Sequence, residues 1–283
     1  MTDIRKTNNV ALYIMYFIVL IFAVLAIYPI FWVIIQSFKT TQEYMLESKL
    51  ALPKVWFVKN YPLTWSGSHN LKFGTLILNS IFYTSITVVS IIMLSFMAGF
   101  AFAKLPSKLT PVLHGSFIVG ILMTLQSILV PLFLMINAFG LYNTRLGVLI
   151  PYIGIGLPMS VYLSAAFIKS IPDSIIESAR IDGAKYFRIF WSIILPIASP
   201  VAATVAIITT TGTWNDFILV QILVSQNELK TLPVGVNMFS GALASDFGKQ
   251  FTAIVIGMMP MIIFYIIFRK QITKGVSAGA VKG

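Results

Sequence analysis

The sequence predicts an all-α, polytopic membrane protein with six transmembrane helices. Of its 283 residues, 58% are hydrophobic and only 10% are charged, whereas a soluble domain is about half apolar and about a quarter charged. The apolar residues gather in six long runs, and the basic residues lie between these runs rather than along one stripe. The net charge of +11 therefore indicates loops anchored at a membrane surface, and no nucleic-acid partner is expected.

Six runs satisfy the requirement for a spanning helix, which is about 20 predominantly apolar residues with a range of about 17–25. The first follows Arg5 and Lys6 and is too long for the ~7–15-residue core of a signal peptide, so it is predicted to be a retained anchor. The fifth ends in the polar cluster "TGTWNDF", which blurs its outer boundary. The six predicted spans are 11–35, 76–103, 112–136, 146–168, 192–223 and 252–268.

The orientation follows from the lysines and arginines of the loops, which are enriched on the cytoplasmic side. With the N-terminus inside, twelve of the 20 basic residues lie in inner segments and eight in outer ones, five of these eight in the single loop 36–74. Both termini are therefore predicted to be cytoplasmic. The chain divides into an N-terminal part with the first span (1–75), a core of spans (76–268) with an inner loop at 169–191, and a cytoplasmic tail (269–283).

Several kinds of chemistry have no support in this sequence. There is no cysteine, the two histidines (His69 and His114) are far apart, and no glycine-rich "GxxxxGK[ST]" phosphate loop is present. No metal site and no catalytic residue is therefore predicted. Three classes remain open, namely a subunit driven by a partner, an autonomous channel or secondary carrier for a polar solute, and a membrane-bound enzyme.

The loop between the fourth and fifth spans is unusually charged, since seven of the 29 fixed charges lie within 169–188. It is predicted to form two short helices joined at Gly183, with Ser170 capping the first and Pro172 in its first turn. One alternative is a re-entry loop whose aromatic residues sit at the headgroup level. The other is a docking surface, because a face lined by small residues and flanked by charges allows close approach of a second protein.

The motif of this loop resembles the "EAA" loop of ABC importer permease subunits. Its spacing is Glu, a small residue, Ala, three residues, Gly, nine residues, Ile, one residue and Leu-Pro, and Ser178 stands where that family often has alanine. The matching positions are Glu177, Ser178, Ala179, Gly183, Ile193, Leu195 and Pro196. The segments "WNDF" (214–217), "TLPVGV" (231–236) and "GVSAGAVKG" (275–283) resemble the carbohydrate-importer branch, in particular its maltose-type smaller permease subunit.

The resemblance implies a type I ABC importer permease fold and a defined set of partners. These are a second, distinct permease subunit forming a heterodimer, two ATPase subunits that bind ATP and Mg²⁺, an extracytoplasmic solute-binding protein, and membrane lipid. The chain itself would be no enzyme and would bind no cofactor. The resemblance also implies that the loop forms a coupling helix that docks on the ATPase through Glu177, Ser178, Ala179, Asp182, Gly183, Ala184, Tyr186 and Phe187.

Polar residues within the spans are candidates for the substrate pathway or a gate. A sugar is recognised by neutral hydrogen-bonding groups and aromatic faces, and the candidates are Asn79, Gln126, Asn137, Trp214, Asn215 and Asp216. The alternative for each is a polar group satisfied by a neighbouring helix. In the resembled maltose system the larger permease carries most of the sugar contacts, so "WNDF" could instead shape an outer gate or contact the binding protein.

Overall fold

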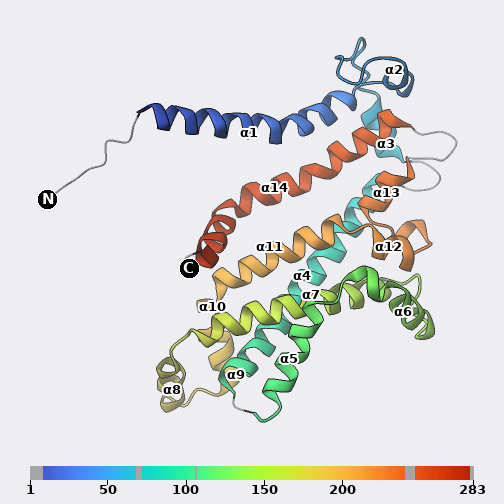
Figure 1. Cartoon of the computed structure of the whole chain (residues 1–283). Helices are drawn as coiled ribbons and strands as arrows, with labels where there is room; N and C mark the ends of the chain where they lie inside the picture. The colour runs from blue at the N-terminus through green and yellow to red at the C-terminus, as the bar shows by residue number, and fades with distance from the viewer. Residues whose placement is uncertain (1–8, 68–71, 106, 240–245, 281–283) are drawn as a thin grey trace. The chain divides into compact units, whose positions relative to one another are not determined.

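The computed structural model describes residues 9–67, 72–105, 107–239 and 246–280, and every regular element in these ranges is helical (Figure 1). The described residues form two compact units. Of the described residues, the first unit contains 9–67, 236–239 and 246–259, and the second contains 72–105, 107–235 and 260–280.

The first unit holds α1 (Asn9–Gln36), α2 (Thr41–Leu46), α3 (Asn60–Ser66) and the first part of α14 (Phe247–Ala280). Hydrogen bonds fix the end of α1, since Asn60 Nδ2 donates to the carbonyls of Ser37 and Lys39, each at 2.8 Å. Thr252 Oγ1 also donates to the Ser37 carbonyl, at 3.2 Å. The side chains of residues 13–31 are exposed, so α1 is anchored at its end and not along its length.

The second unit is built around α4 (Phe73–Lys104) and α7 (Arg145–Lys169), which form its most extensive helix pair. Ser164 Oγ donates to the Ser95 carbonyl at 2.7 Å, so the two backbones lie close together. Gly99 makes this possible, because a Cβ at that position would lie 2.5 Å from Ser164 Oγ. Small residues at helix contacts are typical of membrane bundles, where close backbone packing replaces the hydrophobic effect.

Four of the six predicted spans correspond to single long helices. They correspond to α1, α4, α7 and α14, which are long and apolar enough to cross a membrane. The other two predicted spans are helix pairs with a sharp bend. The described residues therefore contain four such helices, or up to six if each bent pair is one span.

The third predicted span, 112–136, is not one helix. It consists of α5 (Thr110–Ile121) and α6 (Leu125–Ala138), which are bent by 107°. Thr124 directly precedes α6 with an extended backbone (ψ 144°), and its hydroxyl lies 2.9 Å from that of Ser127. Threonine favours such a starting position, whereas hydropathy counts only the apolar residues around it.

The fifth predicted span, 192–223, is interrupted at Ala198 and again between Asn215 and Ile218. α9 (Tyr186–Ile189) continues through a π-helical turn (Phe190–Ile194) into α10 (Leu195–Ile197), and a 75° bend at Ala198 precedes α11 (Ser199–Asn215). Pro196 and Pro200 flank this bend. Pro200 lies in the first turn of α11, where the missing N–H is harmless, whereas Pro196 lies just after the π-helical turn. Beyond α11 follow α12 (Ile218–Leu223), a 3₁₀ turn (Asn227–Leu229) and α13 (Leu232–Met238).

Candidate functional site

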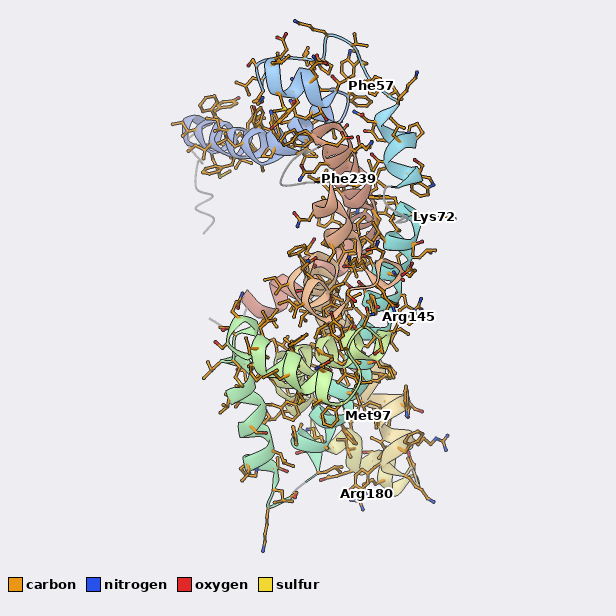
Figure 2. The ribbon with its side chains drawn as sticks, turned by 90° about the vertical axis from the view of Figure 1, so that its right-hand side faces the viewer. Phe57, Lys72, Met97, Arg145, Arg180 and Phe239 are labelled. Atoms are coloured by element: carbon orange, nitrogen blue, oxygen red, sulfur yellow. The ribbon has the colours of Figure 1, made fainter. Side chains whose placement is uncertain are left out.

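The 169–191 loop forms α8 (Asp173–Ile181) and α9, joined at a glycine as the sequence predicted. Gly183 has a φ of +81°, the left-handed region that glycine adopts without strain. The N–H of Ala184 donates to the Ala179 carbonyl at 2.9 Å, and that of Gly183 donates to the Arg180 carbonyl at 3.0 Å. These two bonds make a Schellman motif, which fixes the end of α8. Figure 2 shows Arg145, Met97 and Arg180 in this order along the second unit.

The start of α8 differs from the prediction. Ser170 does not cap it, because Ser170 Oγ donates back to the Phe167 carbonyl at 2.7 Å and closes the end of α7. Pro172 is the residue that precedes the first turn, and it makes no side-chain hydrogen bond there. Asp173 occupies the first turn, where its charge is favourable to the helix dipole.

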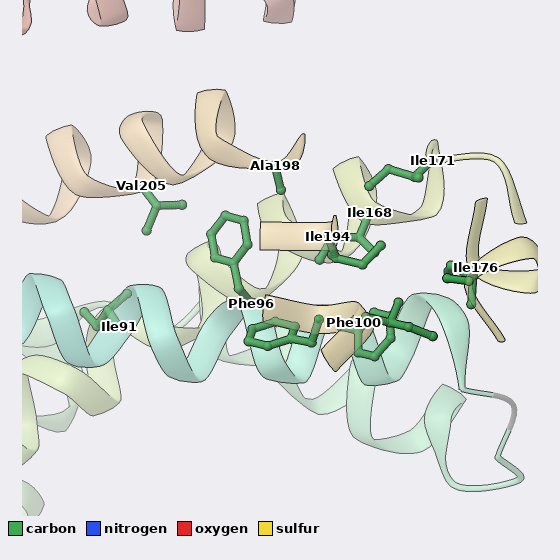
Figure 3. Close-up of a cluster of buried hydrophobic side chains, with 12 residues drawn as sticks. Ile91, Phe96, Phe100, Ile168, Ile171, Ile176, Ile194, Ala198 and Val205 are labelled. Carbon is green, nitrogen blue, oxygen red and sulfur yellow. The ribbon is translucent and has the colours of Figure 1, made fainter. Parts of the chain in front are cut away.

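The inner face of α8 packs on the bundle. Ile176 and Ala179 are buried in a cluster with Phe100 of α4 and Ile168 of α7, to which the π-helical turn adds Ile194 (Figure 3). Ala184 packs against the same cluster. The two alanines of the motif therefore face the bundle in this structure, and the docking role expected of Ala179 and Ala184 stays a prediction.

The outer face of the loop combines charges with exposed apolar side chains. Glu177, Ser178 and Asp182 are exposed, and so is Tyr186, whose ring lies 5.2 Å from Arg180 Cζ. Ile181 is 86% exposed and Phe187 is 72% exposed. Ile181 was not singled out in the sequence, because a single isoleucine in a short helix does not by itself indicate a contact.

Lys104 ties this loop to the end of α4. Its side chain is only 4% exposed, and its Nζ donates to the Ile171 carbonyl at 2.5 Å and to Asp173 Oδ1 at 2.6 Å. Hydrogen bonds from an ammonium group to a carbonyl and a carboxylate are strong, so these two acceptors hold the Lys104 side chain in place. The sequence pattern did not single out Lys104, because its partners are about 70 residues away.

The structure scatters the predicted pathway residues. Asn79 is buried and donates through Nδ2 to the carbonyls of Glu228 (2.7 Å) and Lys230 (2.9 Å), so its amide holds a loop. Gln126 and Asn137 lie exposed on α6. These three side chains therefore have different surroundings, one holding a loop and two exposed on α6.

The "WNDF" residues lie together at the end of α11 but face different surroundings. Asn215 is exposed and donates to the Thr211 carbonyl at 3.0 Å. Trp214 is buried and lines a cavity of about 380 Å³. Asp216 lines another cavity, of about 300 Å³, and its Oδ2 accepts from the hydroxyl of Tyr152 at 3.0 Å.

Long apolar helices packed through small residues, with a charged and apolar loop fixed at one end, define a multi-pass membrane protein. In the described part of the chain, no three His, Asp or Glu side chains come together as metal ligands would. The chain belongs to the family of binding-protein-dependent transport system inner membrane components, whose model matches residues 4–278.

Individual relatives are similar over almost the whole chain. A putative ABC transporter permease protein, ORF2, of Caldicellulosiruptor sp. is 33% identical over 95% of this chain and 96% of its own length. A probable starch degradation products transport system permease protein, AmyC, of Thermoanaerobacterium thermosulfurigenes is 30% identical over 98% and 99%. A bacterial ABC transporter involved in import of the acidic polysaccharide alginate shares the fold, with a TM-score of 0.80, 24% identity and coverage of 95% and 99%.

Proposed function

We propose that this chain is a permease subunit of an ATP-driven oligosaccharide importer, which a separate ATPase moves through the loop 169–191. The observation that carries this proposal is the loop itself. Its inner face is packed on the bundle, Lys104 and a Schellman motif fix its ends, and Ile181 and Phe187 stand exposed among charges. A rigid loop that exposes apolar side chains among charges is suited to bind in a groove on a second protein.

The topology belongs to the same proposal. If each bent pair is one span, the chain has six spans and both termini lie on the same side of the membrane. The basic residues of the loops support the cytoplasm as that side, and the loop 169–191 would then be cytoplasmic too. Residues 1–75, 76–268 and 269–283 then form the anchor with its outer loop, the permease core and the cytoplasmic tail. The core would provide half of the translocation pathway, and a distinct second permease subunit the other half.

The energy source in this proposal lies outside the chain. Two ATPase subunits bind ATP and Mg²⁺, and their closure pulls the coupling helices together. An extracytoplasmic binding protein delivers the sugar. The family name and the starch-product relative support this assignment. The surface that contacts the ATPase would consist of the exposed residues Glu177, Ser178, Ile181, Asp182, Tyr186 and Phe187.

The test is to change Ile181 to Asp in the complete complex. Since Ile181 is 86% exposed, this change leaves the bundle packing intact. Loss of a central contact residue costs about 2 kcal/mol or more, so association with the ATPase should weaken about 30-fold and saccharide-stimulated ATP hydrolysis should fall with it. Leu46→Asp is the matched control, because Leu46 is similarly exposed in the loop 36–74.

Gly183 provides a second test of the same loop. Gly183→Val places a branched side chain at φ +81° and distorts the turn, whereas Gly183→Asn is tolerated there. The valine variant should lose co-purification with the ATPase and the asparagine variant should keep it. Unchanged association in both Ile181→Asp and Gly183→Val, or gradient-driven uptake by the chain alone, refutes the proposal.

A further inference from the structure

One cavity of about 300 Å³ lies among α7, α11 and α12. Its polar lining consists of Tyr152, Ser160, Thr209, Thr213 and Asp216, and the rest is mostly aliphatic. Ligand pockets range over about 300–1,000 Å³, so this one is at the small end. It has room for a single compact ring and not for an extended chain.

Two threonine hydroxyls in this cavity are left for a ligand. On the same helix, Thr204 and Thr211 donate back to the carbonyls of Pro200 (3.2 Å) and Ile207 (2.8 Å), as helical threonines commonly do. Thr209 and Thr213 line the cavity, one turn apart, and their hydroxyls make no hydrogen bond within the described residues. The cavity therefore offers two adjacent groups that can both donate and accept.

Asp216 completes the polar side of the cavity. Its Oδ2 accepts from the Tyr152 hydroxyl at 3.0 Å and from the Leu219 N–H at 3.1 Å. No lysine or arginine in the described ranges forms an ion pair with it. A carboxylate among apolar helices without a cation is a functional-site candidate, and it accepts hydrogen bonds while repelling a second anion.

We infer that this cavity is a subsite for one ring of a neutral saccharide, on the basis of the proposed function as an oligosaccharide importer. The ring hydroxyls bond to Thr209, Thr213 and the Tyr152–Asp216 pair, and the aliphatic wall faces the C–H side of the ring. A uronic acid ring, such as those of the alginate taken up by the structural relative, is disfavoured because its carboxylate would lie near Asp216.

The test uses the complete complex reconstituted in vesicles, with neutral trisaccharides of glucose, galactose or N-acetylglucosamine and with trimannuronate as the acidic probe. Thr209→Val and Thr213→Val remove a hydroxyl at nearly constant shape, and each should raise the KM for uptake of the neutral probe about 2- to 10-fold. Thr204→Val and Thr211→Val are the matched controls, and their KM values should equal that of the unmodified complex.

A binding readout follows from the absence of cysteine in the chain. A Cβ at Gly212 meets nothing within 4 Å, so Gly212→Cys places a single thiol in the cavity without strain. The neutral probe should slow its reaction with a soluble maleimide, and trimannuronate should not.

The two ideas fail in different ways. Uptake by the unmodified complex, combined with KM values of the Thr209 and Thr213 variants equal to those of the controls, overturns the subsite alone. Preferred uptake of trimannuronate, or no protection of the Gly212→Cys thiol, also overturns it. If no probe is taken up by the unmodified complex, the proposed function fails and the subsite with it.

Discussion

Replacing Lys104 by Met should loosen α8 from the bundle while leaving the rest of the second unit folded. Methionine keeps most of the apolar stem but removes the ammonium group that bonds to Ile171 and Asp173. Because Asp173 is 74% exposed, the ion pair contributes only about 0–1 kcal/mol. The charge-assisted bond to the Ile171 carbonyl is the larger part, at about 1.5–3 kcal/mol.

A loss of about 2 kcal/mol corresponds to about 30-fold more frequent local opening. Hydrogen exchange measured by mass spectrometry on the full chain reports this opening directly, and the informative peptide covers residues 173–184. Its amides should exchange about 30-fold faster in Lys104→Met, whereas peptides from the centre of α7 should not change.

Lys108→Met is the control, because Lys108 is exposed and makes no hydrogen bond or ion pair within the described residues. It removes a charge of the same sign from the segment between α4 and α5 and should leave the exchange of residues 173–184 unaltered. Equal exchange of residues 173–184 in the Lys104 and Lys108 variants would refute the reasoning, since the hydrogen bonds of Lys104 would then add nothing to the stability of α8.

Two further predictions concern packing and pH. Gly99→Ala should destabilise the protein by about 1–3 kcal/mol, seen as a lower melting temperature, because the new methyl group would lie 2.5 Å from Ser164 Oγ. Burial by itself would raise the pKa of Asp246, but its hydrogen bonds and ion pair with Lys249 outweigh burial and lower this pKa below 3.8. The stabilisation by Asp246 should therefore be full above about pH 4 and disappear as the pH falls further, so the difference in melting temperature between the unmodified protein and Asp246→Asn should shrink towards pH 3.

Each of these has its own control. Gly154→Ala introduces the same methyl group on α7 where nothing lies within 4 Å, and a melting temperature as low as that of Gly99→Ala would contradict the packing argument. For Asp246, the contradicting result is a difference in melting temperature between the unmodified protein and Asp246→Asn that stays constant from pH 6 to pH 3. It would show that the ionised carboxylate has no net effect on stability.

The sequence pattern predicted the long helices well and the bent ones poorly. The runs at 11–35, 76–103, 146–168 and 252–268 correspond to single helices, because length and apolarity are what a spanning helix requires. The breaks at Thr124 and Ala198 depend on local backbone preferences of one or two residues. A mean hydropathy taken over about 19 residues does not register such preferences. The prolines beside Ala198 were visible in the sequence, but the size of the bend was not.

For the candidate site, the sequence by itself determined the composition of the loop, its glycine turn and the family resemblance, since these depend on residue types at short, fixed spacing. Only the tertiary structure decided that Ala179 faces the bundle, that Ile181 faces outward and that Lys104 holds the loop. It also decided that Asp216 lies beside Tyr152 and two unbonded threonines while Asn79 holds a distant loop. The hydrogen bonds of Lys104, Tyr152 and Asn79 join residues 64 or more positions apart, and they arise from the packing of whole helices.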